Sequence, residues 1–220
     1  MYLNKRIIGI IIARENSKRL KKKNIKKLWG KPLLAHTIIA AKNSIYLDKV
    51  VISTESKNIV KIAKKYKCEA PFIRPKKLSL DYVSATDVFF HALKKIKEYF
   101  DYAVLLQPTS PLRTAEDIDQ SIVKIINENG DSLISVYYTK KKNKFAVRVK
   151  NNKIYKLKNK NYEVKIYYLN GAIFMCNVLY FMKNKNFYSN KTIPYFMKKK
   201  YSVDIDYQKD FNNLINFFKS

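Results

Sequence analysis

The feature that most constrains this chain is an alternation of short apolar runs with segments of helical period, up to residue 138. The apolar runs cover residues 6–13, 49–53, 70–73, 102–106 and 132–138. Between them, apolar residues recur at the spacing of one helix face, and Ser56, Ser84 and Thr114 stand where helix N-caps are expected. Strands that alternate with helices predict right-handed crossovers and a doubly wound, mostly parallel α/β sheet with helices on both faces. Ligands of such sheets bind beyond the carboxyl ends of the strands.

The alternation changes after residue 140. Asn151-Asn152 is typical of a tight turn and predicts a hairpin between apolar segments on its two sides. We interpret residues 140–168 as an insertion that packs on the sheet or on a second subunit. Beyond it we expect strands at 171–176 and 201–206 and a closing helix at 208–218. A chain of 220 residues with 47% hydrophobic residues is then one domain, 1–220, that contains this insertion.

The chain is strongly basic, with 45 Lys and Arg against 17 Asp and Glu and a net charge of +28. Such a charge is compatible with nucleic-acid binding. However, the lysines are scattered over nearly every segment rather than gathered in one stripe. We therefore favour a solvated basic surface over a nucleic-acid footprint, with an electrostatic field that attracts small anionic substrates.

Targeting and redox signals in the sequence are few. No apolar run approaches the ~20 residues of a membrane helix, and no small-residue cleavage site follows the first apolar run. The two cysteines, Cys68 and Cys176, lack the number and spacing of a disulfide framework or a zinc site. We expect a soluble cytoplasmic protein without membrane association.

The loop after the first apolar run is a candidate site for a polyphosphate. It presents Arg14, Ser17, Lys23 and Asn24 shortly before a predicted helix. Cations offset the charge of phosphates, and backbone N–H groups of a turning loop can point at their oxygens. Because Lys and Arg are common in this chain, a solvated basic loop is an equal alternative on composition alone.

The segment LLQPTSPLR at 105–113 ends a buried strand with two prolines around Thr-Ser. A simple strand-ending turn needs only one proline. The pattern favours a rigid loop that places Gln107 and Arg113 at the ligand edge of the sheet.

The third candidate site is SVDID at 202–206. In a strand, Asp204 and Asp206 would lie on the same side as near neighbours. Two adjacent carboxylates are costly unless a hard cation joins them, and Mg²⁺ binds through one or two carboxylates together with phosphate oxygens and water. The alternative is that one aspartate caps the last helix and the other is exposed.

These segments, together with NGAIF at 170–174, resemble those of the CMP-sialic acid synthetases (acylneuraminate cytidylyltransferases) in order and separation. The resemblance implies a Rossmann-like nucleotidyltransferase fold and a Mg²⁺-dependent reaction. In that reaction CTP and a nine-carbon 2-keto sugar acid of the sialic, legionaminic or pseudaminic type give the CMP-sugar and pyrophosphate. The anomeric hydroxyl of the sugar would attack the α-phosphorus, so the protein would mainly align the substrates and neutralise charge.

The resemblance also assigns roles by position. It implies catalytic roles for Arg14, Lys23, Asp204 and Asp206, nucleotide binding by Arg14, Ser17, Lys23, Asn24, Arg74 and Ser84, and metal binding by Asp204 and Asp206. It implies substrate binding by Gln107, Lys144, Lys160, Phe187 and Tyr188.

The chain departs from the family pattern in the sugar half. An Arg-Arg-Gln or Pro-Arg-Gln motif, whose arginine pairs with the sugar carboxylate, corresponds here to residues 159–162, where only Lys160 supplies a positive charge. A lysine gives a point charge without the bidentate fork of arginine. Tyr168 and Phe174 also replace a usual arginine and tyrosine. The sequence therefore leaves the individual sugar acid open.

Two alternatives remain at this point. One is a cytidylyltransferase for another 2-keto sugar acid, such as the eight-carbon Kdo. The other is a non-catalytic relative that binds nucleotide or polyanions through its charge. The resemblance further implies a homodimer, with residues 140–168 reaching the partner subunit.

Overall fold

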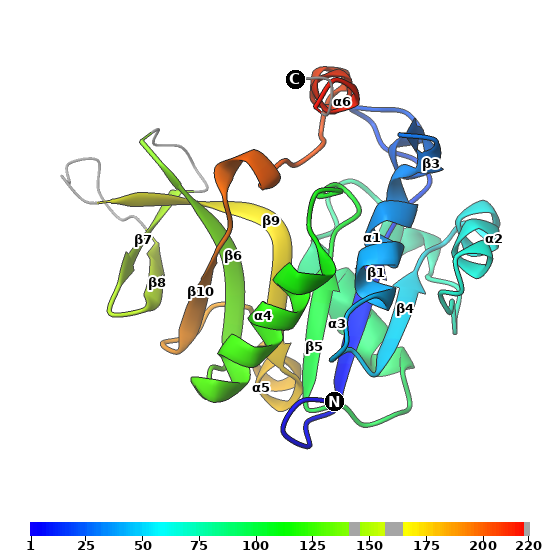
Figure 1. Ribbon diagram of the computed structural model, residues 1–220. Helices are drawn as coiled ribbons and strands as arrows, with labels where there is room; N and C mark the ends of the chain where they lie inside the picture. Colours follow the sequence, from blue (N-terminus) through cyan, green and yellow to red (C-terminus); the bar gives the residue numbers. More distant parts are fainter. Residues whose placement is uncertain (141–145, 157–164, 218–220) are drawn as a thin grey trace.

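A computed structural model describes residues 1–140, 146–156 and 165–217 (Figure 1). Its strands are β1 (Ile7–Ile12), β2 (Lys27–Leu28), β3 (Lys31–Pro32), β4 (Lys49–Ser53), β5 (Tyr102–Leu106), β6 (Ser132–Thr139), β7 (Ala146–Lys150), β8 (Lys153–Lys156), β9 (Ile166–Asn177) and β10 (Thr192–Phe196). Its helices are α1 (Leu33–Lys42), α2 (Lys57–Lys65), α3 (Ala85–Lys95), α4 (Ala115–Asn127), α5 (Val178–Asn184) and α6 (Gln208–Ile215), with the short 3₁₀ helices η1 (Lys23–Ile25), η2 (Lys76–Ser79) and η3 (Lys199–Tyr201).

Eight of the described strands form one sheet, whose central order is β10-β6-β9-β5-β1-β4. β1 pairs in parallel with β4 and β5, and β10 pairs in parallel with β6. β9 runs antiparallel between β5 and β6. The parallel strands explain the near-continuous apolar runs, because both faces of such a strand are buried.

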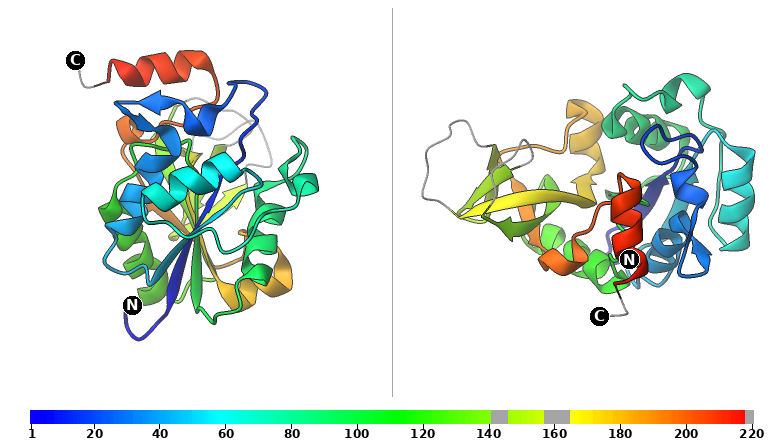
Figure 2. Two further views of the ribbon diagram at one scale, coloured as in Figure 1. Left: turned by 90° about the vertical axis from the view of Figure 1, so that its right-hand side faces the viewer. Right: turned by 90° about the horizontal axis from the view of Figure 1, so that it is seen from above.

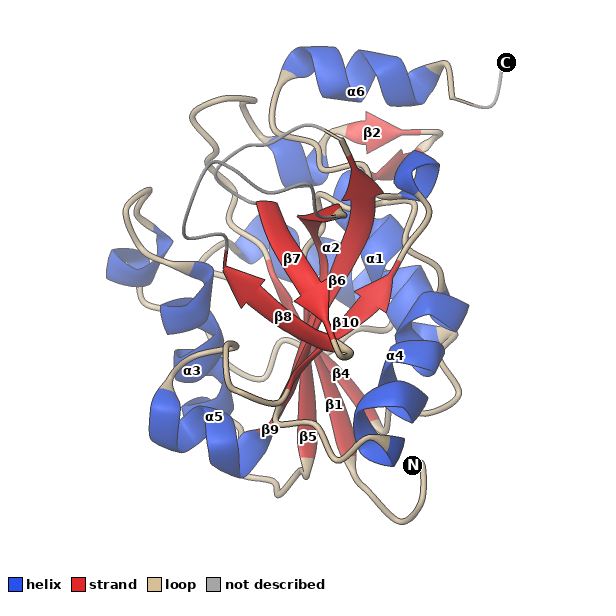
Figure 3. Cartoon of the chain, turned by 90° about the vertical axis from the view of Figure 1, so that its left-hand side faces the viewer, coloured by secondary structure: helices blue, strands red, loops and turns tan. Residues whose placement is uncertain are grey.

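Helices cover both faces of this sheet (Figures 2 and 3). Ile7 and Ile11 of β1 share a buried cluster with residues of α1, α2 and α4. Ile8 and Ile10 face the other way, into a cluster with residues of α3 and α5. The alternation along one strand thus builds two hydrophobic layers, and the predicted doubly wound α/β fold is confirmed.

The predicted helix starts are present in the structure. Ser56 accepts hydrogen bonds from two backbone N–H groups at the start of α2, and Ser84 accepts one from Asp87 at the start of α3. Thr114 and Asp117 form a reciprocal capping box at the start of α4. Among the described residues, no helix combines the length and the apolar character that crossing a bilayer requires.

Two expected strands are wrong. Within residues 70–73, the strand contact is one isolated bridge, between Ile73 and Thr54. Residues 202–206 have no strand pairing; they cross the carboxyl edge of the sheet, where the Ile205 amide donates to the Thr109 carbonyl at 2.9 Å. Ile205 is fully buried, whereas its neighbours are not. The alternation of apolar and polar residues in this segment therefore reflects one buried side chain and not a strand. The additional strand β10 was not predicted.

The expected hairpin is present within the region interpreted as an insertion. β7 pairs with β8 around Asn151 and Asn152, which both have positive φ angles of 49° and 54°, as a tight hairpin turn requires. β6 and β9 continue as a pair to Thr139 and Ile166, and the hairpin joins β9 there. Figure 1 shows this extension projecting beyond the helix layers. The domain boundaries and the role of 140–168 in dimerisation stay predictions.

A third apolar cluster fastens the C-terminal segment over the loop that follows β1. It contains Leu20 and Leu28 from the N-terminal side and Ile205, Phe211 and Leu214 from the C-terminal side. Helix α6 therefore lies beside β2 and β3 although they are far apart in the sequence (Figure 2).

Arg113 is a buried cation that holds the loop after β5. Its side chain donates to the carbonyls of Gln107 and Ala172 at 3.2 and 2.8 Å and to the Thr37 hydroxyl at 2.8 Å. Desolvation lowers its pKa to about 10. The expectation that Arg113 would lie at the ligand edge is wrong. Arg113 is buried and fixes the loop from behind, and it does not line the cavity at that edge.

We predict that Arg113→Met destabilises the fold by about 2–4 kcal/mol, because the buried Ala172 carbonyl and Thr37 hydroxyl each lose a charged hydrogen-bond donor. Urea unfolding followed by circular dichroism measures this change. Arg148→Met is the control, since Arg148 is only half-buried on β7 and stacks on Tyr155; its effect should stay within about 0.5 kcal/mol. Equal losses in the two variants would contradict the assignment.

Candidate active site

A cavity of about 510 Å³ opens at the carboxyl ends of β1 and β5. Its walls come from four separate parts of the chain: the loop after β1, the segment that leads into α3, the loop after β5 and the segment that precedes α6. The residues predicted for the site that line it are Arg14, Ser17, Lys23, Asn24, Arg74, Gln107 and Asp206. The position matches the expectation for a doubly wound sheet.

Lys23 joins the N-terminal loop to the C-terminal segment. Its ammonium group donates to the Ile205 carbonyl at 2.6 Å and to Asp206 Oδ1 at 3.1 Å. Arg19 contacts the other oxygen of Asp206 at 2.6 Å. The basic loop and the acidic segment therefore meet across the cavity, and Asp206 has two cationic partners rather than standing uncompensated.

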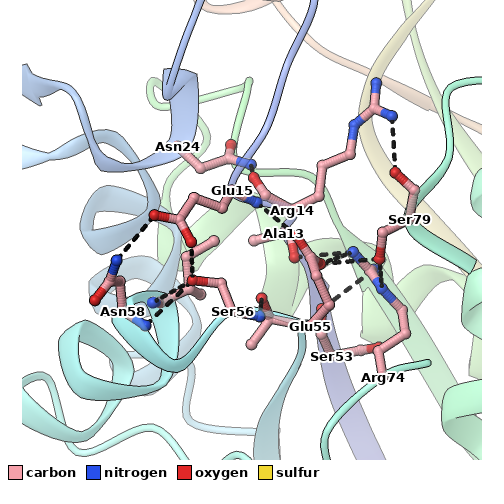
Figure 4. Close-up of polar contacts among 12 residues, drawn as sticks. Ala13, Arg14, Glu15, Asn24, Ser53, Glu55, Ser56, Asn58, Arg74 and Ser79 are labelled. Carbon is pink, nitrogen blue, oxygen red and sulfur yellow. Dashed lines mark hydrogen bonds and ion pairs between the residues drawn. The ribbon is translucent and has the colours of Figure 1, made fainter. Parts of the chain in front are cut away.

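Asn24 shapes the loop from inside. It is buried, and its Nδ2 donates to the carbonyl of Arg14 at 2.8 Å (Figure 4). This bond fixes the turn that carries Arg14 toward the cavity. In the structure Asn24 thus acts on the backbone of the loop, and a direct role in nucleotide binding stays a prediction.

Gln107 and Asp204 both lie beside Gly171 at the bulge of β9, although Asp204 itself does not line the cavity. Gly171 has a φ of +74°, and a Cβ atom there would lie 3.9 Å from Asp204 Oδ2 and 4.0 Å from Gln107 Nε2. Desolvation by the surrounding protein raises the pKa of Asp204, and the nearby charge of Asp206 raises it further, while the adjacent Thr109 side chain opposes the shift. The charges of Asp204 and Asp206 therefore interact, but across an irregular segment and not along the expected strand.

A carboxylate from the segment before α3 already occupies two of the loop's cations. Asp81 contacts Arg14 at 2.7 Å and Lys18 at 3.0 Å. The hydrogen bond from Lys18 and the charge of Arg14 lower its pKa. An anionic ligand that bound Arg14 and Lys18 would therefore have to compete with Asp81 for these cations.

Arg74 and Ser84 are engaged by the protein. Arg74 is buried at the floor of the cavity and donates to the Ala13 and Ser53 carbonyls, to Glu55 and to Ser79. Ser84 caps α3 and does not line the cavity. Their predicted contacts with a pyrimidine and a ribose stay predictions.

Two of the residues expected to bind the sugar acid, Phe187 and Tyr188, do not line this cavity, whereas Gln107 does. Phe187 is 4% exposed and packs against Phe89, Phe174 and Phe181 in the hydrophobic layer of α3 and α5. Tyr188 is half-buried beside it and does not line the cavity. Lys144 and Lys160 lie outside the described residues.

Sequence reasoning assigned no role to four polar residues at or behind this cavity: Lys18, Arg19, Glu55 and Asp81. Lys18 and Arg19 could have been found, since they lie in the loop already singled out. Glu55 lies two residues beyond the end of the parallel strand β4, in the region where ligand-edge residues gather. Asp81 has no local signal, because only the tertiary fold brings its segment across the loop.

The two histidines and the two cysteines do not line the cavity. His36 Nε2 lies 2.9 Å from the Leu28 carbonyl, and His91 stacks edge-on against Phe72. Cys68 and Cys176 are buried and free, and burial raises the pKa of Cys68 to about 12.

Comparison with known proteins gives a family match and similar curated proteins. The family model described as cytidylyltransferase matches residues 8–219. The chain is 36% identical over 212 residues to the CMP-N,N'-diacetyllegionaminic acid synthase of Legionella pneumophila, which covers 91% of each chain. It is 33% identical over 180 residues to a pseudaminic acid cytidylyltransferase of Campylobacter jejuni, covering 80% of this chain and 78% of that protein. It is 35% identical over 215 residues to the N-acylneuraminate cytidylyltransferase of Escherichia coli, covering 94% of this chain but only 50% of that longer protein.

Solved structures share the fold at low sequence identity. A CMP:2-keto-3-deoxy-manno-octonic acid synthetase complexed with CTP has a TM-score of 0.77 and 12% identity, and the match covers 97% of this chain and 98% of that one. The 4-diphosphocytidyl-2C-methyl-D-erythritol synthase of Anaerococcus prevotii has a TM-score of 0.68 and 13% identity, with 98% and 99% covered. These likenesses support the fold.

We predict that Asp81→Asn binds inorganic pyrophosphate about three- to tenfold more tightly at low ionic strength, because Arg14 and Lys18 lose their competing carboxylate. Isothermal titration calorimetry at two salt concentrations measures the change. Glu69→Gln removes an equal charge from an exposed ion pair with Lys49 and should leave the affinity unchanged. Weaker binding by Asp81→Asn would show that Asp81 supports the anion site instead of competing for it.

Proposed function

Because this chain belongs to the cytidylyltransferase family, we propose that it transfers CMP from CTP to a nine-carbon 2-keto sugar acid and releases pyrophosphate. The observation that carries the proposal is the convergence of Arg14, Lys23, Gln107 and Asp206 on one cavity at the ligand edge of the sheet. The names of the similar curated proteins support the nine-carbon class, since they comprise legionaminic, pseudaminic and N-acylneuraminic acid enzymes.

In the proposed mechanism, the basic loop binds the triphosphate. Arg14, Ser17 and Lys23 offset its negative charge, and the loop backbone, held by Asn24, orients it. The anomeric hydroxyl of the sugar acid attacks the α-phosphorus, a new P–O bond forms, and the bond to pyrophosphate breaks. Gln107 orients the sugar, and Asp204 or Asp206 takes the proton of the attacking hydroxyl. Arg14 and Lys23 stabilise the charge that develops on the leaving pyrophosphate.

We propose a magnesium ion at this site, on the chemistry of the oxygen donors that the chain and a nucleotide would supply. Within the described residues, no group of three or more His, Cys, Asp and Glu side chains could hold a metal unaided. Mg²⁺ does not require one, because one or two carboxylates and the phosphates of a nucleotide suffice. Asp204 and Asp206, whose charges interact, would hold it, and it would neutralise phosphate charge during the transfer.

We further propose that Lys144 and Lys160 supply charge for the sugar carboxylate and that Phe187 and Tyr188 support the sugar side. Lys144 and Lys160 lie in segments outside the described residues. We also propose the cytoplasm as the location, because CTP, the proposed donor, is an intracellular nucleotide.

A coupled assay of pyrophosphate release tests the function. The wild-type chain should release pyrophosphate from CTP with at least one of the sialic, legionaminic and pseudaminic acids when Mg²⁺ is present. Turnover only with an eight-carbon acid such as Kdo would show that the substrate is an eight-carbon and not a nine-carbon sugar acid. Absence of turnover with every acid, together with salt-sensitive binding to random DNA, would instead support a polyanion-binding relative.

We predict that Asp206→Asn lowers kcat by about a hundredfold or more while the chain stays folded, since one carboxylate of the proposed metal pair is lost. Steady-state kinetics over a range of Mg²⁺ concentrations measures this. Asp119→Asn is the control. Asp119 lies on α4, contacts Ser44 and does not line the cavity. Normal turnover in Asp206→Asn would refute the metal assignment.

We also propose that the chain forms a homodimer. On the extension of β6 and β9, Tyr167 packs against Tyr138 and Phe196, and the latter two are 49% and 48% exposed. An exposed aromatic row on a projecting extension is typical of a protein interface. Light scattering should give twice the mass of one chain, and Phe196→Glu should reduce it to one. A monomeric wild-type chain would contradict the proposal.

A further inference from the structure

Glu55 lies behind the cavity and accepts hydrogen bonds from three residues, Glu15, Arg74 and Ser79 (Figure 4). One carboxylate oxygen accepts from the Glu15 amide at 2.8 Å. The other accepts from Arg74 Nη2 at 2.8 Å and from the Ser79 hydroxyl at 2.9 Å. The Glu55 side chain is only 14% exposed, so these bonds lie largely away from solvent.

The segments that Glu55 joins are the ones that hold Arg14. Glu15 follows Arg14 directly, and its amide is fixed by Glu55. On the other side, the Ser79 carbonyl accepts from Arg14 Nη1 at 3.2 Å, while the Ser79 hydroxyl is held by Glu55. One carboxylate thus fixes both the backbone next to Arg14 and the residue that orients its guanidinium.

Arg74 extends this arrangement to the sheet. Its guanidinium donates to the carbonyls of Ala13 and Ser53 at 3.1 and 3.3 Å, where β1 and β4 end. Arg74 is 3% exposed, and its ion pair with Glu55 compensates its buried charge. Through Arg74, Glu55 connects the loop to the rigid part of the fold.

A carboxylate so close to a proposed polyphosphate site has an electrostatic cost. The backbone amides of Glu15 and of Glu55 itself, together with the charge of Arg74, outweigh the effect of burial and lower the pKa of Glu55. Glu55 therefore stays negatively charged at neutral pH and repels phosphates. Its favourable contribution must come from the geometry that it imposes.

We propose that Glu55 is a positioning residue of the nucleotide site, which sets the geometry of the loop around Arg14 for the triphosphate. The inference rests on the proposed nucleotide binding and assigns the site a residue that need not touch the substrate.

Glu55→Gln separates positioning from charge, because the two effects have opposite signs. Glutamine has nearly the same shape but one carbonyl oxygen, so it cannot accept from both Glu15 and Arg74, and its NH₂ group would face a donor. If charge alone mattered, removal of a carboxylate would tighten the binding of an anion. If Glu55 positions the loop, the same substitution weakens it.

The experiment measures the Kd of CTP and, separately, of inorganic pyrophosphate by calorimetry on the full chain. We expect Glu55→Gln to weaken both by about tenfold or more and to raise KM for CTP while KM for the sugar acid changes by less than about twofold. Asp81→Asn is the matched comparison. It also removes one negative charge near the cavity, but it leaves the hydrogen bonds of Glu15 and Arg74 to Glu55 in place. We expect it not to weaken binding.

Binding by Glu55→Gln that equals or exceeds that of the wild type would overturn the inference. A wild-type chain that binds pyrophosphate but not CTP would overturn the proposed function, while the pyrophosphate comparison would still test Glu55. A wild-type chain that binds neither would overturn both.

Thermal unfolding of each variant shows whether it folds. If Glu55→Gln lacks a cooperative transition, Glu55→Asp decides the question, because it keeps the charge and shortens the side chain by one methylene group. We expect binding by Glu55→Asp to lie between that of the wild type and complete loss. Wild-type affinity in Glu55→Asp would then overturn the inference.

Discussion

The site depends on the contact of Lys23 with the segment that precedes the last helix. Its ammonium group reaches a backbone carbonyl and the carboxylate of Asp206 at once, and the apolar cluster of Leu20, Ile205 and Phe211 lies alongside. The cluster supplies the non-directional burial that brings the two segments together, and the polar contacts fix their register. Without this closure the cavity would lack one wall.

The cations of the cavity are compensated by the protein itself. Asp206 contacts Arg19 and Lys23, Asp81 contacts Arg14 and Lys18, and Glu55 contacts Arg74. Such pairs hold long side chains near one geometry before a ligand arrives, which reduces the entropy that binding costs. The ion pairs of Asp81 and Asp206 are partly exposed, so a bound phosphate could take the place of these carboxylates. The ion pair of Arg74 and Glu55 is buried. This difference separates the side chains suited to meet a phosphate from those that support them.

Much of the fold could be predicted because its signals are local. Buried parallel strands appear as continuous apolar runs, and the caps at Ser56, Ser84 and Thr114 need only a few neighbouring residues. The loop at 14–24 could be placed at the ligand edge because it follows such a strand. The inward direction of Arg74 and Arg113 could not, since it depends on carbonyl groups of distant segments. The segment 202–206 imitates a strand because Ile205 alone is buried between polar neighbours.

The closure between Lys23 and Asp206 spans 183 residues of sequence, and this has a consequence for the biogenesis of the protein. During translation the sheet strands β1, β4 and β5 leave the ribosome long before the acidic segment does. The nascent chain therefore carries a basic loop whose counter-charges near the C-terminus do not yet exist. The contact can form only after residue 206 has been made, so the anion site is completed after the scaffold that supports it.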